Sequence, residues 1–460
     1  MSTVGGQSMT SGPEWIMVGF EGDGAGEGEL SWGQKENWTT SVAHRTWLPQ
    51  GGARPLPPGT TLADIADGIS RLMKRYQPMR TRMRLRADGR PIQVVHGSGE
   101  VAVEIVDAKD DPGAVAEAVC ERYRNTPLDF TAEWPLRMAV IRHNGQLTHM
   151  AELISHLAVD AAGAVVMMTG AATGHETPVT GMQPLAQAAW QRSPAGRRQN
   201  EAAMRYWETI YRTTDARRFD NRQPEHSPRY WHGEYDSPAL LSAVRAIAAS
   251  SGLGTSMVFL ALFALALNDL NGINPVVIRP IVGNRFRPGL AGVVCTVAQA
   301  GVCVLDVAGT SFDEALRRAQ RASMNAYKYA YFDDEDLIAL RARIFAERGT
   351  TVDMGCFIND RHGVGGQRDT GPVLALGQIR ETVHPSTFRW LEGQDGPSLE
   401  PLFVAIDDIP DAIQVSVHLD TRYVSLADGE ALVRGMEATA VAACEPGTYR
   451  PPSRRTASAR

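Results

Sequence analysis

Apolar residues recur along the chain with the periods of both helices and strands. A spacing of three or four positions predicts helices over 61–75, 113–125, 163–169, 198–212, 238–250, 255–269, 311–329 and 427–443. Short apolar or alternating runs predict strands at 81–86, 93–95, 136–142, 147–154, 230–235, 276–281, 353–358, 402–406 and 413–418. Asp88-Gly89 and Asn144-Gly145 each separate two of these runs, and both dipeptides favour tight hairpin turns. Mixed helices and strands in both halves predict an α+β protein built from two comparable lobes.

The composition also indicates where the lobes begin and end. Residues 170–200 are rich in Gly, Thr, Pro and Gln, which is typical of a linker. Residues 1–12 and 446–460 are small, polar or basic, and we expect both ends to be flexible. The sequence therefore predicts a first lobe over 13–180 and a second lobe over 181–445.

Composition and charge exclude several classes of partner. With 43% hydrophobic and 21% charged residues, the 460-residue chain has the composition of a soluble globular protein, and its formal charge of −6 argues against nucleic-acid binding. The five cysteines are scattered and lack C-x-x-C spacing, so neither a disulfide framework nor a bound metal is expected, and a cytoplasmic location fits. The longest apolar run, 257–267, is far shorter than the roughly 20 residues that cross a bilayer. It predicts a buried helix in a protein without a membrane partner.

The segment Ser155-His156-Leu157-Ala158-Val159-Asp160-Ala161 carries the candidate chemistry. It directly follows the apolar strand predicted at 147–154. Small residues, Ala161-Ala162-Gly163, come next and could let a substrate approach the backbone closely. Eleven histidines should produce about one H-x-x-x-D spacing by chance, so the spacing alone identifies nothing.

Motifs along the chain supply the missing context, because they resemble the condensation domains of non-ribosomal peptide synthetases and the related chloramphenicol acetyltransferases. His156 and Asp160 match the second His and the Asp of that family's H-H-x-x-x-D-G, while Ser155 and Ala161 replace the first His and the Gly. The other similar stretches follow in family order at Leu30–Trp38, Gln77–Arg82, Asn125–Phe130, Trp134–Arg137, Tyr206-Trp207, Val282–Pro288 and Tyr327–Asp333.

The resemblance implies a fold and a set of site residues. It implies two chloramphenicol acetyltransferase-like lobes in a V-shaped arrangement, with an active-site tunnel between them. His156 would lie at the centre of the tunnel, where its neutral imidazole accepts a proton from an attacking amine or hydroxyl, or orients that group. Asp160 would form a buried salt bridge with Arg285 that fixes the loop. The expected tunnel residues are Ser155, Ala161, Ala162, Gly163 and Asn359, the last of which alternatively belongs to an Asn-Asp turn.

Two departures from the family motif bear on activity. Fungal terminal condensation domains resemble S-H-x-x-x-D, so a Ser at position 155 is compatible with catalysis. We expect Ser155 to point away from whatever His156 faces, because side chains alternate along a strand. The methyl group of Ala161 could crowd the acyl thioester, or exclude a conformation that needs a positive φ.

The resemblance predicts a condensation-type acyltransferase that forms an amide or an ester bond in natural-product biosynthesis. The acyl or aminoacyl group would arrive on the phosphopantetheine arm of an acyl or peptidyl carrier protein, with no permanently bound cofactor. The acceptor would be a small amine or alcohol, or a second carrier-bound substrate, and the enzyme a monomer. One alternative, favoured by Ser155 and Ala161, is a degenerate module that recruits a carrier protein or tailoring enzyme. Another is an acyltransferase that uses coenzyme A thioesters.

Overall fold

The computed structural model describes residues 14–172, 179–215, 226–364, 371–391, 393–396 and 400–445. The expected flexible ends, 1–12 and 446–460, lie outside these ranges. The chain divides into two compact units, the first made of residues up to Arg192 together with Arg285–Val297, and the second of Ser193–Asn284 and the residues from Ala298 onward. We expected the chain to divide once, at residue 180. The first unit instead extends to Arg192 and also includes Arg285–Val297, from the second half of the sequence.

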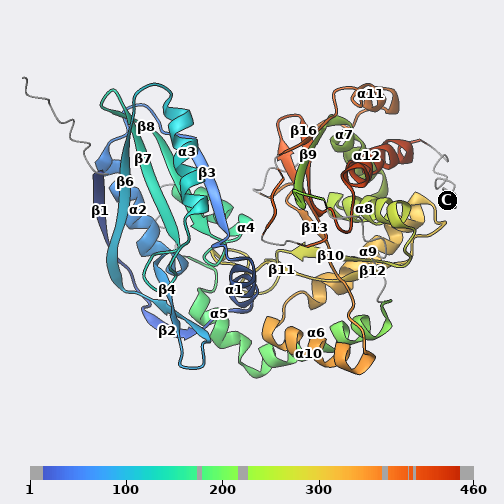
Figure 1. Ribbon diagram of the computed structural model, residues 1–460, viewed down its shortest axis with the longest axis horizontal. Helices are drawn as coiled ribbons and strands as arrows, with labels where there is room; N and C mark the ends of the chain where they lie inside the picture. Colours follow the sequence, from blue (N-terminus) through green and yellow to red (C-terminus); the bar gives the residue numbers. More distant parts are fainter. Residues whose placement is uncertain are drawn as a thin grey trace, which may run out of the picture. The chain divides into compact units, whose positions relative to one another are not determined.

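A five-stranded mixed sheet forms the centre of the first unit, in the order β1-β6-β7-β8-β3 (Figure 1). Its strands are β1 (Glu14–Glu21), β3 (Pro49–Pro55), β6 (Ser98–Ala108), β7 (Leu136–His143) and β8 (Gln146–Ser155). Only β6 and β7 run parallel to each other among these neighbours. A smaller antiparallel sheet in the order β2-β5-β4 joins β2 (Gly26–Glu29), β5 (Pro91–Val95) and β4 (Thr81–Leu85).

Helices cover both faces of the five-stranded sheet. The helices of this unit are α1 (Trp32–His44), α2 (Leu62–Arg75), the short 3-10 helix η1 (Gln77–Arg80), α3 (Pro112–Asn125), α4 (Ala161–Ala172) and α5 (Pro184–Gln191). On one face, apolar residues of α2 and α4 share a core with strand residues, and on the other face α3 does so. The first turn of α2 is held by a capping box, in which Thr61 and Asp64 bond to each other's backbone amides.

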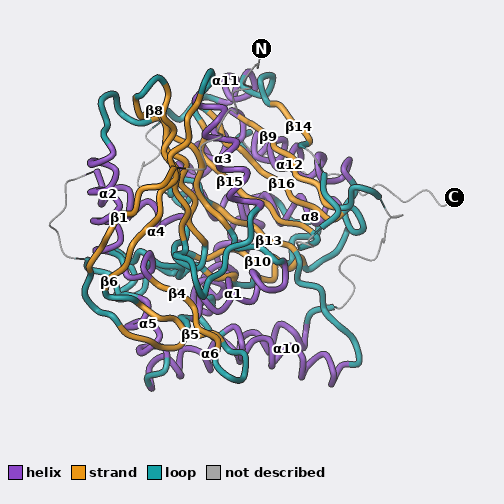
Figure 2. Tube along the Cα trace, turned by 60° about the vertical axis from the view of Figure 1, so that its left-hand side comes forward, coloured by secondary structure: helices purple, strands orange, loops and turns teal. Residues whose placement is uncertain are grey.

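The second unit contains an eight-stranded mixed sheet, in the order β11-β10-β13-β15-β16-β9-β14 with β12 paired to β10. Its strands are β9 (Tyr230–Ser237), β10 (Val276–Val282), β11 (Gln299–Ala300), β12 (Cys303–Leu305), β13 (Cys356–Asp360), β14 (Thr387–Trp390), β15 (Leu402–Ile409) and β16 (Ala412–Asp420). Its helices are α6 (Pro194–Thr213), α7 (Pro238–Ser251), α8 (Thr255–Asn271), α9 (Phe312–Tyr329), α10 (Asp334–Arg348), α11 (Leu376–Glu381) and α12 (Leu426–Ala443). Apolar residues of α7, α8 and α12 form one large core with this sheet, whose strands are orange in Figure 2.

The prediction of a buried helix at 257–267 is confirmed, because all side chains from Val258 to Leu267 are buried in α8. Among the described residues no single helix is long and apolar enough to cross a membrane, although α7 and α8 meet that test as a bent pair.

Most predicted helices and strands are confirmed within a few residues, including both hairpins. The segment 170–200 was expected to be a linker, but α5 and the beginning of α6 lie within it. Pro184 and Pro194 do not break these helices, because each occupies the first helical position, where a backbone N–H would have no helical acceptor.

Candidate active site

His156 lies in a tight turn between β8 and α4. The turn is closed by the Ser155 carbonyl, which accepts from the amides of Ala158 and Val159 at 2.9 and 3.3 Å, and the His156 amide donates to the Leu48 carbonyl at 2.9 Å. Among the side chains of residues 155–160, that of His156 alone is half-buried, while the others are buried. The turn therefore presents the imidazole and buries its neighbours.

Ser155 points into the interior below the turn, and its expected place in a substrate tunnel stays a prediction. Its side chain is fully buried. The hydroxyl donates to the Trp47 carbonyl at 2.8 Å and accepts from the Leu157 amide at 3.2 Å. Both contacts are to backbone, so this serine supports the turn from beneath and is not placed to act as a nucleophile.

Asp160 begins helix α4 as its capping residue. Oδ1 accepts from the Gly163 amide at 2.8 Å and from Arg285 Nη2 at 2.5 Å. Oδ2 accepts from Arg285 Nη1 at 2.9 Å and from the Val297 amide at 3.0 Å. The carboxylate is buried, and the two-pronged bond to the guanidinium with two amide donors supplies both oxygens with partners.

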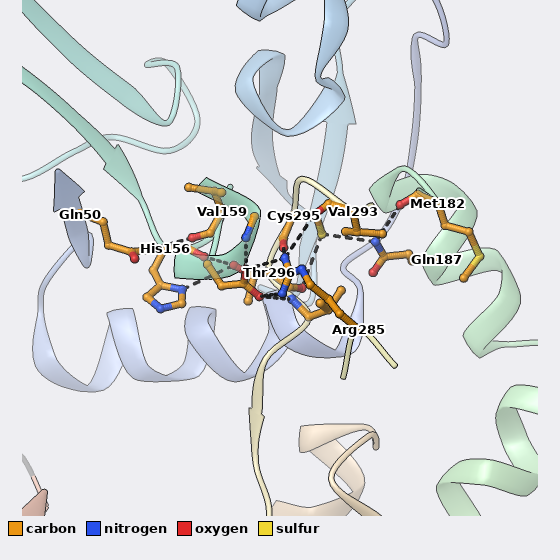
Figure 3. Close-up of polar contacts among 12 residues, drawn as sticks. Gln50, His156, Val159, Met182, Gln187, Arg285, Val293, Cys295 and Thr296 are labelled. Carbon is orange, nitrogen blue, oxygen red and sulfur yellow. Dashed lines mark hydrogen bonds and ion pairs between the residues drawn. The ribbon is translucent and has the colours of Figure 1, made fainter. Parts of the chain in front are cut away.

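Arg285 connects the segment 285–297 to this helix start. Besides Asp160, its Nη2 donates to the carbonyls of Val293 and Cys295 at 3.1 and 3.2 Å (Figure 3). A Cβ atom at Gly163 would lie 2.9 Å from Nη2, so glycine lets the guanidinium pack closely against the start of α4. Gly163 is buried against the ion pair, and its expected place in a tunnel stays a prediction.

Ala161 and Ala162 occupy the first turn of α4 and are half-buried. A helical residue has negative φ, so the substitution of alanine for the family's glycine at 161 imposes no backbone strain. Of the two effects expected for this methyl group, only the steric one is compatible with the structure.

Sequence reasoning missed three residues that hold the turn. The Thr296 hydroxyl donates to the His156 carbonyl and lies 3.5 Å from its Nδ1 atom. Gln50 Nε2 donates to the Val159 carbonyl at 2.8 Å (Figure 3). Gly33 in α1 permits close packing, since a Cβ atom there would lie 2.5 Å from the Thr296 carbonyl oxygen. No local pattern marks Thr296 or Gln50, because their partners lie over a hundred positions away in the sequence. Gly33 lies within the family-like stretch Leu30–Trp38, but that stretch does not reveal its contact with Thr296.

Cys295 is the thiol nearest in sequence to these contacts, and it is not suited to nucleophilic chemistry. It is buried, with Gln187 Nε2 at 3.5 Å from its sulfur. Burial, reinforced by the negative charge of Asp160, raises the pKa of the thiol to about 12. Within the described ranges, no group of three or more His, Cys, Asp or Glu side chains could hold a metal ion.

Asn359 belongs to the second unit, where it lies in β13 opposite Ala405 of β15. Its side chain is half-buried. The alternative, an Asn-Asp turn, does not fit this position in a strand, although the neighbouring Asp360 does accept from the His362 amide at 3.0 Å. The role of Asn359 as a substrate contact stays a prediction.

Comparisons with known proteins point to a single family. The family model described as "Condensation domain" matches residues 59–345, which is more than half of the chain. One of the proteins that make up the linear gramicidin synthase of Brevibacillus parabrevis is 23% identical over 334 residues, covering 66% of this chain and 6% of that protein. The chain thus spans only a small part of this relative's length.

Solved structures share the fold at low sequence identity. The condensation domain that mediates chain release from the enacyloxin polyketide synthase is 18% identical with a TM-score of 0.67, covering 89% of this chain and 82% of that one. The X-domain solved in complex with OxyB from teicoplanin biosynthesis is 16% identical with a TM-score of 0.66, covering 92% and 94%. These likenesses show the mixed helix and sheet fold with two chloramphenicol acetyltransferase-like lobes. The chain therefore belongs to the condensation domain family.

Proposed function

We propose that this chain catalyses transfer of an acyl group from a carrier-protein-bound thioester to an amine or hydroxyl, with His156 as the base. One observation carries the proposal: the turn 155–160 buries every side chain except the imidazole, and buried polar bonds fix the turn on both sides. Condensation domains of peptide synthetases work with the phosphopantetheine arm of carrier proteins, which supports this choice of donor.

The proposed reaction needs one proton acceptor near the attacking group. The imidazole takes the proton of the amine or hydroxyl as its nitrogen or oxygen bonds to the thioester carbon. The tetrahedral intermediate then expels the phosphopantetheine sulfur, which receives that proton from the imidazolium. An amide or ester and a free thiol result.

Asp160 and Arg285 are positioning residues in this proposal. Their ion pair is nearly inaccessible to water, with side-chain exposures of 3% and 15%. A pair so buried provides fixed geometry more than net stability, and removing one partner costs about 3–5 kcal/mol. Ala161 and Ala162 would lie closest to the acyl group, at the start of α4.

The test is a transfer assay with a purified carrier protein loaded with an acyl group. Candidate amines and alcohols are supplied, and product is measured by mass spectrometry. We expect His156→Ala to lower turnover by roughly 10²-fold or more, the lower end of what a positioned base contributes. His384→Ala, which changes an exposed histidine, is the matched control and should retain full activity. If His156→Ala shows the same turnover as wild type, the result contradicts the role of His156 as the base.

A second candidate function is recruitment without catalysis. The likeness to an X-domain in complex with OxyB favours it, since that neighbour assembles with another protein of its pathway. In this case the chain would bind a carrier protein or a tailoring enzyme, and no acceptor would be acylated. Binding of a loaded carrier without turnover for any acceptor supports this candidate, whereas turnover with acyl coenzyme A alone indicates a donor that needs no carrier.

A further inference from the structure

We infer that Thr296 is a positioning residue that fixes the protonation state of the catalytic imidazole, with the proton on Nδ1 and the lone pair on Nε2. The inference rests on the proposed function only for its effect on turnover, because the protonation state itself can be measured without substrate. His156 and Thr296 both belong to the first unit.

A single hydroxyl faces two groups of His156. Thr296 Oγ1 is hydrogen-bonded to the His156 carbonyl oxygen and lies 3.5 Å from Nδ1 of the same residue (Figure 3). A carbonyl oxygen carries no hydrogen, so the hydroxyl must donate its one proton there. The Thr296 oxygen therefore presents a lone pair, and not a hydrogen, to Nδ1.

At Nδ1, that assignment favours one of the two neutral tautomers. If Nδ1 also had a lone pair, it would face the lone pair of Oγ1 and be repelled. With a proton on Nδ1 the same approach is attractive, and in a neutral imidazole Nε2 is then the acceptor. Nε2 is thus the nitrogen that could take the proton of an attacking amine or hydroxyl.

The Asp160–Arg285 pair holds Thr296 from both sides along the chain. The preceding carbonyl, of Cys295, accepts from Arg285 Nη2, and the following amide, of Val297, donates to Asp160 Oδ2. Thr296 is fully buried, and its own carbonyl packs closely against Gly33 of α1. The ion pair therefore fixes the position of the Thr296 hydroxyl, and it acts on His156 through this hydroxyl.

The decisive measurement is the protonation state of His156 by ¹⁵N nuclear magnetic resonance on histidine-labelled protein. The resonances of His156 are assigned by their loss in His156→Ala. We expect wild type to show protonated Nδ1 and unprotonated Nε2 at a pH where the ring is neutral. Protonated Nε2 in wild type would overturn the inference whether or not any variant folds.

Three variants test the hydroxyl itself. Thr296→Val should lose the Nδ1–H form and lower kcat roughly 10²-fold with little change in KM, since it removes the acceptor that selects the tautomer. Thr296→Ser should keep both the tautomer and the rate. Thr421→Val is the matched control, because Thr421 is also buried and donates to a backbone carbonyl, that of Arg229, at 2.8 Å. It should change neither.

The outcomes separate the two proposals. An Nδ1–H tautomer that Thr296→Val leaves intact overturns the role of Thr296. Absence of turnover in wild type, with the Nδ1–H tautomer present and dependent on the hydroxyl, contradicts the proposed function and leaves the positioning role standing.

Discussion

At the scale of single residues, the Ser155 hydroxyl joins separate stretches of backbone around the turn that carries His156. It bonds to the Trp47 carbonyl and the Leu157 amide, and both bonds are buried. A buried donor or acceptor that loses its partner costs about 1–3 kcal/mol. Substitution of this serine should therefore affect folding stability and leave the chemistry of the imidazole intact.

We expect Ser155→Ala to lower the free energy of unfolding by about 1–3 kcal/mol, because it leaves a carbonyl and an amide unpaired in the interior. Urea denaturation measures this loss, and the acyl-transfer assay should show wild-type kcat per folded molecule. Ser98→Ala, at an exposed serine, is the control and should alter neither quantity. Lost turnover at unchanged stability would argue for a direct role of the hydroxyl.

The sequence was sufficient to predict the Asp160–Arg285 ion pair, because a motif and a family resemblance mark both residues. The catalytic role of His156 stays a prediction. The sequence was insufficient for Thr296, whose hydroxyl meets a residue 140 positions earlier in the chain. It was also insufficient for the packing of Gly163, since nothing local reveals that a guanidinium packs where a Cβ atom would be. Sequence patterns report local preference, and these contacts are set by tertiary packing.

At the scale of elements, most strands with apolar or alternating runs were predicted, whereas β1, β3 and β6 were not. Strand β3, with the sequence PQGGARP, contains two prolines and two glycines, yet it pairs along its whole length with β8. Gly51 in its middle has φ of 118°, and a Cβ atom there would lie 2.2 Å from the Glu152 carbonyl oxygen. The close approach of the β3 and β8 backbones, and not a high β propensity, accounts for glycine at this position. Helix α1 was missed for a related reason, since its 13 residues show no apolar period.

Two neighbouring strands of the second unit carry a pair of stacked histidines that predicts a pH dependence of stability. His232 of β9 and His418 of β16 are register partners with ring centroids 4.0 Å apart. Burial, with smaller contributions from His232 and Arg361, lowers the pKa of His418 from 6.5 to about 4. Protonating one ring of this half-buried stack is unfavourable in the folded state.

Because the unfolded chain binds this proton below about pH 6.5 and the folded chain only below about pH 4, stability should fall as the pH falls through this interval. We expect His418→Phe to lose less stability than wild type between pH 6.5 and pH 4, as measured by urea unfolding at each pH. His384→Gln, at an exposed histidine, should follow wild type. Parallel curves for wild type and His418→Phe would exclude His418 as the source.

At the scale of the whole molecule, the compact units are not continuous in sequence. The segment Arg285–Val297 leaves the second unit's part of the chain and completes the first unit. It brings Arg285 to Asp160, and Val294 to the apolar core that α2 and α4 share with the sheet. A unit that depends on a distant segment cannot be isolated by a single cut at residue 192.

We expect a fragment of residues 14–192 to unfold without cooperativity or at a much lower temperature than a fusion that appends 285–297 through a flexible Gly-Ser linker. Without the segment, Asp160 is a buried charge lacking its partner, at a cost of about 3–5 kcal/mol. Circular dichroism during heating compares the two proteins. The fusion with Arg285→Leu is the matched control and should behave like the fragment. Equal stability of fragment and fusion would show that the segment is dispensable.

The buried state of Cys295 has a practical consequence for following the proposed acyl transfer. Cys120, Cys295, Cys303 and Cys356 are buried, and burial raises the thiol pKa of the first three as well as that of the half-buried Cys444. The thiols with a raised pKa stay protonated and react slowly with disulfide reagents. Each transfer would release one exposed phosphopantetheine thiol. The enzyme's own thiols would add little to the signal from a disulfide reagent. Turnover could then be titrated continuously with a chromogenic disulfide, without separating product from substrate.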